Sequence, residues 1–168
     1  MEQTRETYLT WLRDAHAMEE QALTMMRGML ARLEHYPSLS ARLEQHIGET
    51  ERQEHELKAL LDGYASDRSV MKDAMAKMTA AGQAMSGLFT ADEVVKGSMA
   101  SYTFEHMEIA AYQVLIAAAL ELGDSQAAEV FRRILAEEEA MAEWLFENLS
   151  PTTAQFLQRA EADLTAKR

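Results

Sequence analysis

The stretch 102–112, Tyr-Thr-Phe-Glu-His-Met-Glu-Ile-Ala-Ala-Tyr, places two carboxylates three residues apart in the middle of a long apolar segment. Residues spaced three and four apart share one face of a helix, so Glu105, Glu108 and Tyr112 lie on one stripe. An amphipathic helix buries such a stripe. A carboxylate in that place must be protonated, paired or bound to a cation, because burying an isolated charge is costly.

The composition predicts an all-α protein. The 168 residues include only two prolines and seven glycines, and the length suits one domain over 1–168. The sequence has no cysteine, which excludes disulfides and thiolate metal ligands. The formal net charge of -12 argues against nucleic acid and anionic membranes as partners. Without an apolar signal region or a run of about 18 apolar residues, we expect a cytoplasmic protein.

Hydrophobic spacing and helix-breaking residues divide the chain into four main helices. We expect these helices at about 4–36, 38–62, 90–122 and 124–148. Pro37 is expected to stop the first helix, and Gly63 to end the second. A short crossover helix over 66–87 and a C-terminal tail helix over 151–167 complete the expected four-helix bundle.

Polar residues interrupt the apolar seam of each long helix near its middle. The interruptions, in chain order, are His16, Glu19, His46, Glu49, Gln53, Glu105, Glu108 and Glu138. The midpoints of antiparallel helices lie at similar heights, so these groups are expected to meet at one level of the core. Five ionised carboxylates cannot share a dry pocket without cations. Oxygen-rich sites suit iron or manganese, so the pattern predicts a di-metal site of the kind found in ferritin-like carboxylate proteins.

Each interruption also has a simpler interpretation when it is taken alone. Glu105 and Glu108 could pair with surface cations, and the run Glu137–Glu139 is typical of a solvated helix surface. A lone histidine such as His46 is usually an ordinary surface or core residue. His106 lies off the Glu105 stripe, and we do not assign it to the site. The recurrence of the interruption on all four helices favours a buried cluster.

Four segments carry a similarity to a known family: 12–21, 46–53, 104–112 and 135–145. Together they resemble the YciE/YciF-like family of bacterial stress proteins, a branch of the ferritin-like superfamily related to rubrerythrin and bacterioferritin. The resemblance covers nearly the whole chain. It implies a four-helix ferritin-like bundle, often dimeric, with a poorly defined biochemical role in general or osmotic stress.

The resemblance also implies metal ligands at particular positions. Glu19 matches the first-helix ligand of the superfamily. Glu105 and Glu108 match the third-helix pair of rubrerythrin-type sites. Glu138 matches the glutamate of the fourth-helix Glu-x-x-His motif. These four positions are the expected core of the site.

Two departures from the family pattern remove the usual imidazole ligands. Met141 stands where the fourth-helix motif has its histidine, and Gln53 stands where the second-helix motif has its own. Thioether sulfur is a poor ligand for iron, and a glutamine amide is a weak neutral donor. His16 or His46 could compensate. The expected metal ligands are therefore Glu19, Glu49, Gln53, Glu105, Glu108 and Glu138, around iron or manganese.

Two functions follow as hypotheses. The first is a metal-binding stress protein with di-iron oxidoreductase activity towards Fe(II) or peroxide. The second is a non-enzymatic helical dimer that acts through protein interactions and has a degenerate, metal-free core. We expect a homodimer in either case, because the Met-rich stretch 66–87 and the amphipathic tail 151–167 offer apolar surface.

Overall fold

The computed structural model describes residues 2–65, 91–162 and 164–166 of the chain. This part forms the helices α1 (Glu2–Leu30), α2 (Pro37–Ala65), α4 (Glu93–Glu121) and α5 (Ser125–Glu161). The described residues contain no strand, so the predicted all-α bundle is confirmed. The expected crossover helix over 66–87 lies outside the described residues.

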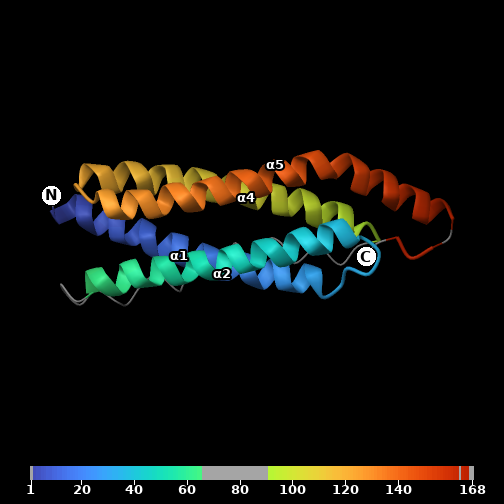
Figure 1. The fold of residues 1–168 in the computed structure, drawn as a ribbon, viewed down its shortest axis with the longest axis horizontal. Coiled ribbons are helices and arrows are strands. Elements are labelled where there is room, and N and C mark those ends of the chain that lie inside the picture. Colours follow the sequence, from blue (N-terminus) through green and yellow to red (C-terminus); the bar gives the residue numbers. More distant parts are fainter. Residues whose placement is uncertain (1, 66–90, 163, 167–168) are drawn as a thin grey trace.

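The bundle is built from two helical hairpins. α1 packs against α2 and α4 packs against α5, while α1 also packs against α4. Figure 1 shows the α1–α2 pair lying along one side of the α4–α5 pair. α2 and α5 approach each other over a shorter stretch than the other packed pairs. All four helices contribute fully buried apolar side chains to the core, among them Leu12, Leu43, Leu115, Phe131 and Leu145.

The predicted boundaries of the first two helices were wrong at their junction. α1 ends at Leu30 rather than near residue 36, and α2 begins at Pro37. A proline restricts the preceding residue to extended conformations, but its missing N–H costs nothing at the first helical position. Pro37 therefore opens α2 instead of merely stopping α1. At the other end, α2 continues through Gly63 to Ala65.

The predicted break near residue 150 was also wrong. α5 runs without interruption from Ser125 to Glu161 and contains Pro151, so the expected tail helix is its last part. Proline cannot donate the usual backbone hydrogen bond inside a helix. The neighbouring turns carry side-chain bonds to backbone carbonyls, from Asn148 Nδ2 to Trp144 O at 2.8 Å and from Thr153 Oγ1 to Leu149 O at 2.7 Å. Figure 1 shows α5 bending in its last part and extending beyond the ends of the other helices.

The turn between α4 and α5 agrees with the sequence. Gly123 has a φ of 75°, a left-handed conformation that suits glycine after a helix C-terminus. Asp124 then caps α5 by accepting a hydrogen bond from the Ala127 amide at 2.9 Å. α4 itself begins at Glu93 and ends at Glu121, close to the expected 90–122.

The C-terminal end of the chain folds back on the connection between α1 and α2 (Figure 1). Gln155 Nε2 donates to the carbonyl of His35 at 2.7 Å, and the buried Tyr36 hydroxyl donates to the carbonyl of Ala166. These bonds fix the connection at one end of the bundle. Within the described ranges, no helix is both long enough and apolar enough to cross a membrane.

Candidate metal centre

Four carboxylates meet in the middle of the bundle core. Glu19 comes from α1, Glu105 and Glu108 from α4, and Glu138 from α5. None of the four is more than 3% exposed. The apolar stripes that fold these helices together therefore carry the glutamates inward, as the spacing predicts. Glu105 and Glu108 face the core side by side because they lie one helical turn apart.

These carboxylates are poorly satisfied by the protein itself. Five of their eight oxygens have no hydrogen-bond partner among the described residues: Glu19 Oε2 and both oxygens of Glu108 and Glu138. An ionised oxygen buried without a partner is strongly destabilising. This donor set fits divalent cations that prefer oxygen ligands, such as manganese or iron.

α2 contributes a buried imidazole to the cluster. His46 is 1% exposed, and its Nε2 lies 3.2 Å from Glu105 Oε2 and 3.2 Å from Glu138 Oε2. The contact with Glu105 has hydrogen-bond geometry, whereas Glu138 is held by charge. One ring atom of His46 and one oxygen each of Glu105 and Glu138 lie within 4.8 Å of one another, close enough to share one cation.

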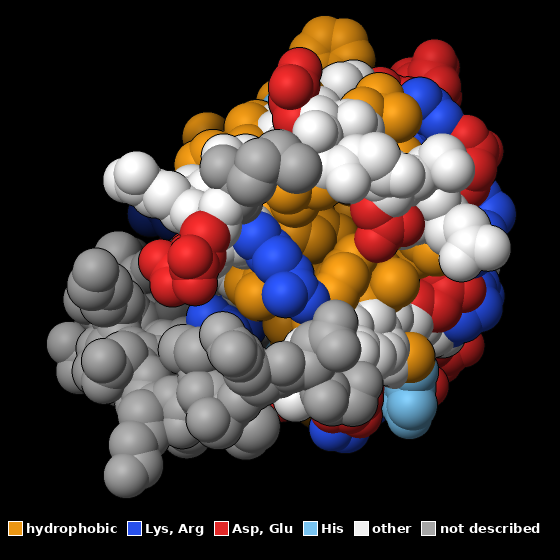
Figure 2. All heavy atoms as spheres, turned by 90° about the vertical axis from the view of Figure 1, so that its left-hand side faces the viewer, with side chains coloured by type: hydrophobic (Ala, Val, Ile, Leu, Met, Phe, Trp, Pro, Cys, Tyr) orange, Lys and Arg blue, Asp and Glu red, His pale blue; other side chains and the backbone are white. Residues whose placement is uncertain are grey.

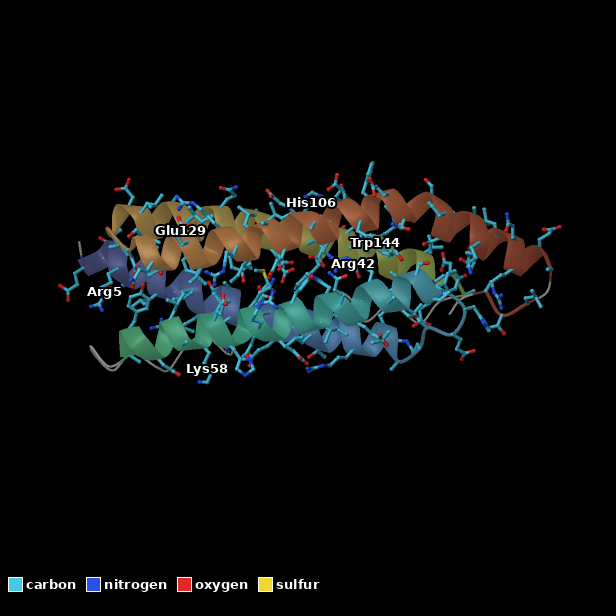
Figure 3. All side chains as sticks on the ribbon, viewed as in Figure 1. Arg5, Arg42, Lys58, His106, Glu129 and Trp144 are labelled. Atoms are coloured by element: carbon cyan, nitrogen blue, oxygen red, sulfur yellow. The ribbon has the colours of Figure 1, made fainter. Side chains whose placement is uncertain are left out.

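The other side of the His46 ring is fixed by Glu49. His46 Nδ1 lies 2.8 Å from Glu49 Oε2, and Glu49 is also bound by Gln45 and Arg42. Burial raises the pKa of Glu49, but the hydrogen bonds from His46 and Gln45 and the charge of Arg42 outweigh it and lower the pKa to about 2. Figure 3 shows Arg42 on the side of α2 that faces the α4–α5 pair. Glu49 therefore orients the imidazole from outside the buried cluster.

Burial changes the acidity of the cluster. It raises the pKa of Glu105 to about 7, despite the opposing hydrogen bond from His46. Burial, together with the charge of neighbouring carboxylates, raises the pKa of Glu19 and Glu108 well above the ordinary value. Burial alone would lower the pKa of His46, but its contacts with Glu105, Glu138 and Glu49 raise it well above the ordinary value. Without cations, the cluster therefore holds protons at neutral pH.

A tyrosine orients the carboxylate of α1. The fully buried Tyr112 hydroxyl donates a hydrogen bond to Glu19 Oε1. The Tyr112 ring packs against Phe131, with centroids 6.3 Å apart. Burial and the adjacent Glu19 charge raise the pKa of Tyr112 well above its ordinary value, so the phenol stays a donor. This contact leaves Glu19 Oε2 directed into the cluster without a partner.

The structure separates the six expected ligands into two groups. Glu19, Glu105, Glu108 and Glu138 lie together in the cluster. Gln53 is also buried, with its Oε1 unpartnered and its Nε2 donating to Glu137 at 2.8 Å. Glu49 stands at the edge, and its side chain is 17% exposed.

Sequence reasoning left two functional residues out of the ligand set. His46 was named only as a histidine that could compensate for the missing imidazoles, although its position three residues before Glu49 on one helix face was visible. Glu137 was read as part of a solvated charge run, and nothing in the sequence reveals its bond to the buried Gln53. His16, the other candidate imidazole, instead bonds to Glu54 at 2.7 Å near the surface.

The structure also places Met141 and His106, two residues that the sequence analysis did not include among the metal ligands. Met141 is fully buried in the core and supplies no imidazole. His106 points outward from α4, with its ring 4.5 Å from that of Tyr102 (Figure 3). His106 therefore lies away from the carboxylate cluster.

A separate cleft lies at the end of the bundle near the N-terminus. It has a volume of about 430 Å³ and is lined by Glu2, Arg5, Tyr8, Tyr64, Leu122 and Asp124. The end-on view in Figure 2 shows hydrophobic side chains around basic ones at this end. The Tyr64 hydroxyl donates to Asp124, and Tyr8 and Tyr64 are 3.1 Å apart at their oxygens. None of the lining residues belongs to the carboxylate cluster.

Residues 3–158 match the protein family described as "Domain of unknown function (DUF892)". The chain belongs to this family. A solved structure of a protein from Xanthomonas campestris is 40% identical to it, with a TM-score of 0.79 over 95% of this chain and 99% of that one. The E. coli stress protein YciF has the same fold at 23% identity, with a TM-score of 0.72 over 89% of this chain and 96% of YciF.

A third solved structure also shares the fold. YcfI from Rhodopseudomonas palustris is 24% identical, with a TM-score of 0.67, and the match covers 84% of this chain and 92% of YcfI. The predicted relation to YciF is therefore supported, and these matches extend over most of the bundle.

Proposed function

We propose that this member of the DUF892 family is a ferritin-like stress protein that binds a di-metal centre of iron or manganese. The observation that carries the proposal is the set of four buried carboxylates with five unpartnered oxygens beside His46. Two divalent cations carry the four positive charges that balance four ionised carboxylates. The name of the related E. coli stress protein supports the physiological part of the proposal.

The residues have distinct roles in this proposal. Glu19, Glu105, Glu108 and Glu138 hold the cations, and His46 takes the place of the imidazole that Met141 and Gln53 do not provide. Metal-binding histidines are commonly oriented by a carboxylate on their other ring nitrogen, which is the position of Glu49. Gln53 can offer its unpartnered Oε1 as a neutral ligand.

The chemistry in this proposal is oxidation of Fe(II) or consumption of peroxide. Iron or manganese supplies the redox steps when bound, and the protein supplies the ligands, their orientation and the exclusion of water. Tyr112 holds Glu19 by donating its phenolic proton. The buried apolar side chains around the cluster keep the dielectric low, which strengthens each charge interaction.

Elemental analysis and thermal unfolding test the proposal together. We expect about two iron or manganese ions per chain after reconstitution of the purified protein. A ligand at 100 times its dissociation constant stabilises the native state by about 2.7 kcal/mol, so the melting temperature should rise by roughly 5–10 °C. Absence of bound metal after reconstitution, with no change in melting temperature, would refute the proposal and favour the metal-free alternative.

The outward face of α4 supports the expected homodimer. Between Lys96 and Glu121 the sequence has no charged residue apart from Glu105 and Glu108, and both of these point into the core. Met99, Met107 and Val114 recur at intervals of two helical turns and are 55%, 47% and 46% exposed. In a chain of net charge -12, two copies can meet on this face without bringing carboxylates together.

Val114→Glu is therefore expected to weaken the dimer at least tenfold, because it buries two unpaired charges at the interface. Light scattering coupled to size-exclusion chromatography across a dilution series measures the effect. Gln113→Glu, which adds the same charge at the next residue of α4, is the control. A wild-type chain that is monomeric at high micromolar concentration would contradict the expectation.

A further inference from the structure

The carboxylate cluster is closed to solvent, so a cation can reach it only by passing between helices. Glu19, Glu105, Glu108, Glu138 and His46 are each at most 3% exposed. Such a route of access rests on the proposed metal-binding function. A route should combine loose packing with polar groups that can carry a cation inward.

The line along which α2 and α5 face each other, called here the α2–α5 seam, has fewer close backbone approaches than the other packed helix pairs. Ion pairs cross the seam at the level of the cluster: Arg52 with Glu137, and Arg133 with Glu56 at 3.0 Å. Such exposed pairs typically contribute only about 0–1 kcal/mol each, so they separate easily.

Glu137 connects the solvent to a buried side chain across this seam. Its side chain is 30% exposed, and its Oε1 pairs with the guanidinium of Arg52, which is 53% exposed. Its Oε2 accepts a hydrogen bond from Nε2 of the buried Gln53 at 2.8 Å. One carboxylate thus holds a surface cation with one oxygen and a core amide with the other.

Within the described ranges, the buried side chains at the inner end of this connection have oxygens without hydrogen-bond partners. Gln53 is 1% exposed, and its Oε1 has no hydrogen-bond partner among the described residues. The residue after Glu137 is Glu138, which is fully buried in the cluster and accepts no hydrogen bond from the described residues. Burial therefore increases along the set of oxygen ligands on this side of the bundle, from Glu137 to Gln53 to Glu138.

We propose that divalent cations reach the cluster through the α2–α5 seam, with Glu137 as the carboxylate that receives them first. The incoming cation takes the place of the Arg52 guanidinium on Glu137, and Arg52 remains in solvent. Rotation of the Gln53 amide then offers Oε1 to the cation on its way to Glu138. The divalent cation carries one more positive charge than the guanidinium that it displaces, and the cluster carboxylates balance this charge when they release their protons.

In the described part of the chain, one other surface carboxylate reaches the cluster: Glu49 bonds to Nδ1 of His46, but both ring nitrogens of His46 are already engaged, so this connection offers no free ligand atom. His16 and Glu54 join α1 to α2, and Arg27 and Glu51 do the same further along, but these residues bond to each other rather than to the cluster. The outward face of α4 carries no charge between Lys96 and Glu121. Among the described residues, the α2–α5 seam is thus where a partly exposed carboxylate bonds directly to a buried amide that has an unsatisfied oxygen.

Stopped-flow loading of the metal-free full chain with Mn(II), followed by loss of the free-ion EPR signal, tests the route. Glu137→Gln is expected to slow loading about tenfold, as electrostatic guidance of ions typically changes rates by 10-fold or more. The number of Mn(II) ions bound at equilibrium should stay unchanged. Arg52→Gln, which removes the competing guanidinium, should speed both loading and release to EDTA several-fold.

Glu139→Gln is the matched control, because it removes the same charge from an exposed position two residues along α5. Equal loading rates for Glu137→Gln and Glu139→Gln would overturn the route while leaving the metal site intact. A wild-type chain that binds neither Mn(II) nor Fe(II) would overturn the proposed function, and the route would fall with it. Circular dichroism of each variant confirms that the helices are retained.

Discussion

Glu108→Gln should make the metal-free protein more stable and abolish its stabilisation by Mn(II). Glu108 is 1% exposed, and neither of its oxygens has a hydrogen-bond partner in the described part of the chain. The substitution keeps the shape of the side chain and removes the free-energy cost of holding a buried carboxyl protonated beside Glu19 and Glu138 at neutral pH. Each unit by which the pKa of a carboxyl is raised adds about 1.4 kcal/mol to this cost. The lost ligand should eliminate most of the metal-dependent rise in melting temperature.

A gain of stability without metal, together with a loss of the stabilisation by Mn(II), distinguishes a metal-binding carboxylate from a structural one. Thermal unfolding with EDTA and with Mn(II) gives both in one experiment. Glu121→Gln, on the exposed end of the same helix, should change stability by no more than about 0.5 kcal/mol and leave the Mn(II) effect intact. If Glu108→Gln destabilised the metal-free protein and preserved the Mn(II) effect, Glu108 would be a structural residue.

Metal-free protein should lose stability as the pH rises from 5 to 8. The native pKa of Glu105 is raised from 4.5 to about 7, so the native state binds more protons than the unfolded state between these values. The free energy of unfolding therefore falls as pH rises through this window. At about 1.4 kcal/mol per pKa unit, the loss is on the order of 3 kcal/mol, or roughly 5–10 °C in melting temperature.

The titratable groups around Glu105 also lower the stability of the metal-free protein as the pH rises. Glu19 and Glu108 also have raised pKa values, and His46 contributes stability below its ordinary pKa that is lost as pH rises. Glu49 has the opposite shift, to about 2, so its contribution is complete above pH 5 and constant in this window. Melting temperatures measured with EDTA at pH 5, 6, 7 and 8 check the slope.

Mn(II) should reverse this dependence. Binding requires deprotonated carboxylates and releases their protons, so the stabilisation by Mn(II) should grow with pH over the same range. A metal-free melting temperature that rises from pH 5 to pH 8 would contradict the assignment of protonated carboxyls to the core.

The sequence predicted the helices that carry the site better than it predicted their ends. The apolar stripes around Glu19, Glu105 and Glu138 repeat over many turns, and this periodicity decides which face of a long helix is buried. The ends depend on single residues with two possible meanings. Pro37 can stop one helix or open the next, and Pro151 can break a helix or lie within one that neighbouring contacts support.

Some residues of the site can be predicted from the pattern within one helix, whereas others depend on contacts between helices that are distant in the sequence. Four glutamates could be assigned to the core because each interrupts an apolar stripe on its own helix. The role of His46 depends on how α2 is placed against α4 and α5, since its Nε2 contacts Glu105 and Glu138. The role of Glu137 likewise depends on its hydrogen bond with Gln53, which is 84 residues away in the sequence. Periodicity within one helix carries no information about such pairs.

The division of the bundle into two hairpins has a consequence for the order of folding. The α1–α2 hairpin contains Glu19 and His46, and the α4–α5 hairpin contains Glu105, Glu108 and Glu138. Contacts within each hairpin join segments that are close in sequence, so they form quickly. The carboxylates of the two hairpins lose their water together only when the hairpins dock. Docking is therefore the step that protons or cations should accelerate, and metal-free chains at high pH should refold most slowly.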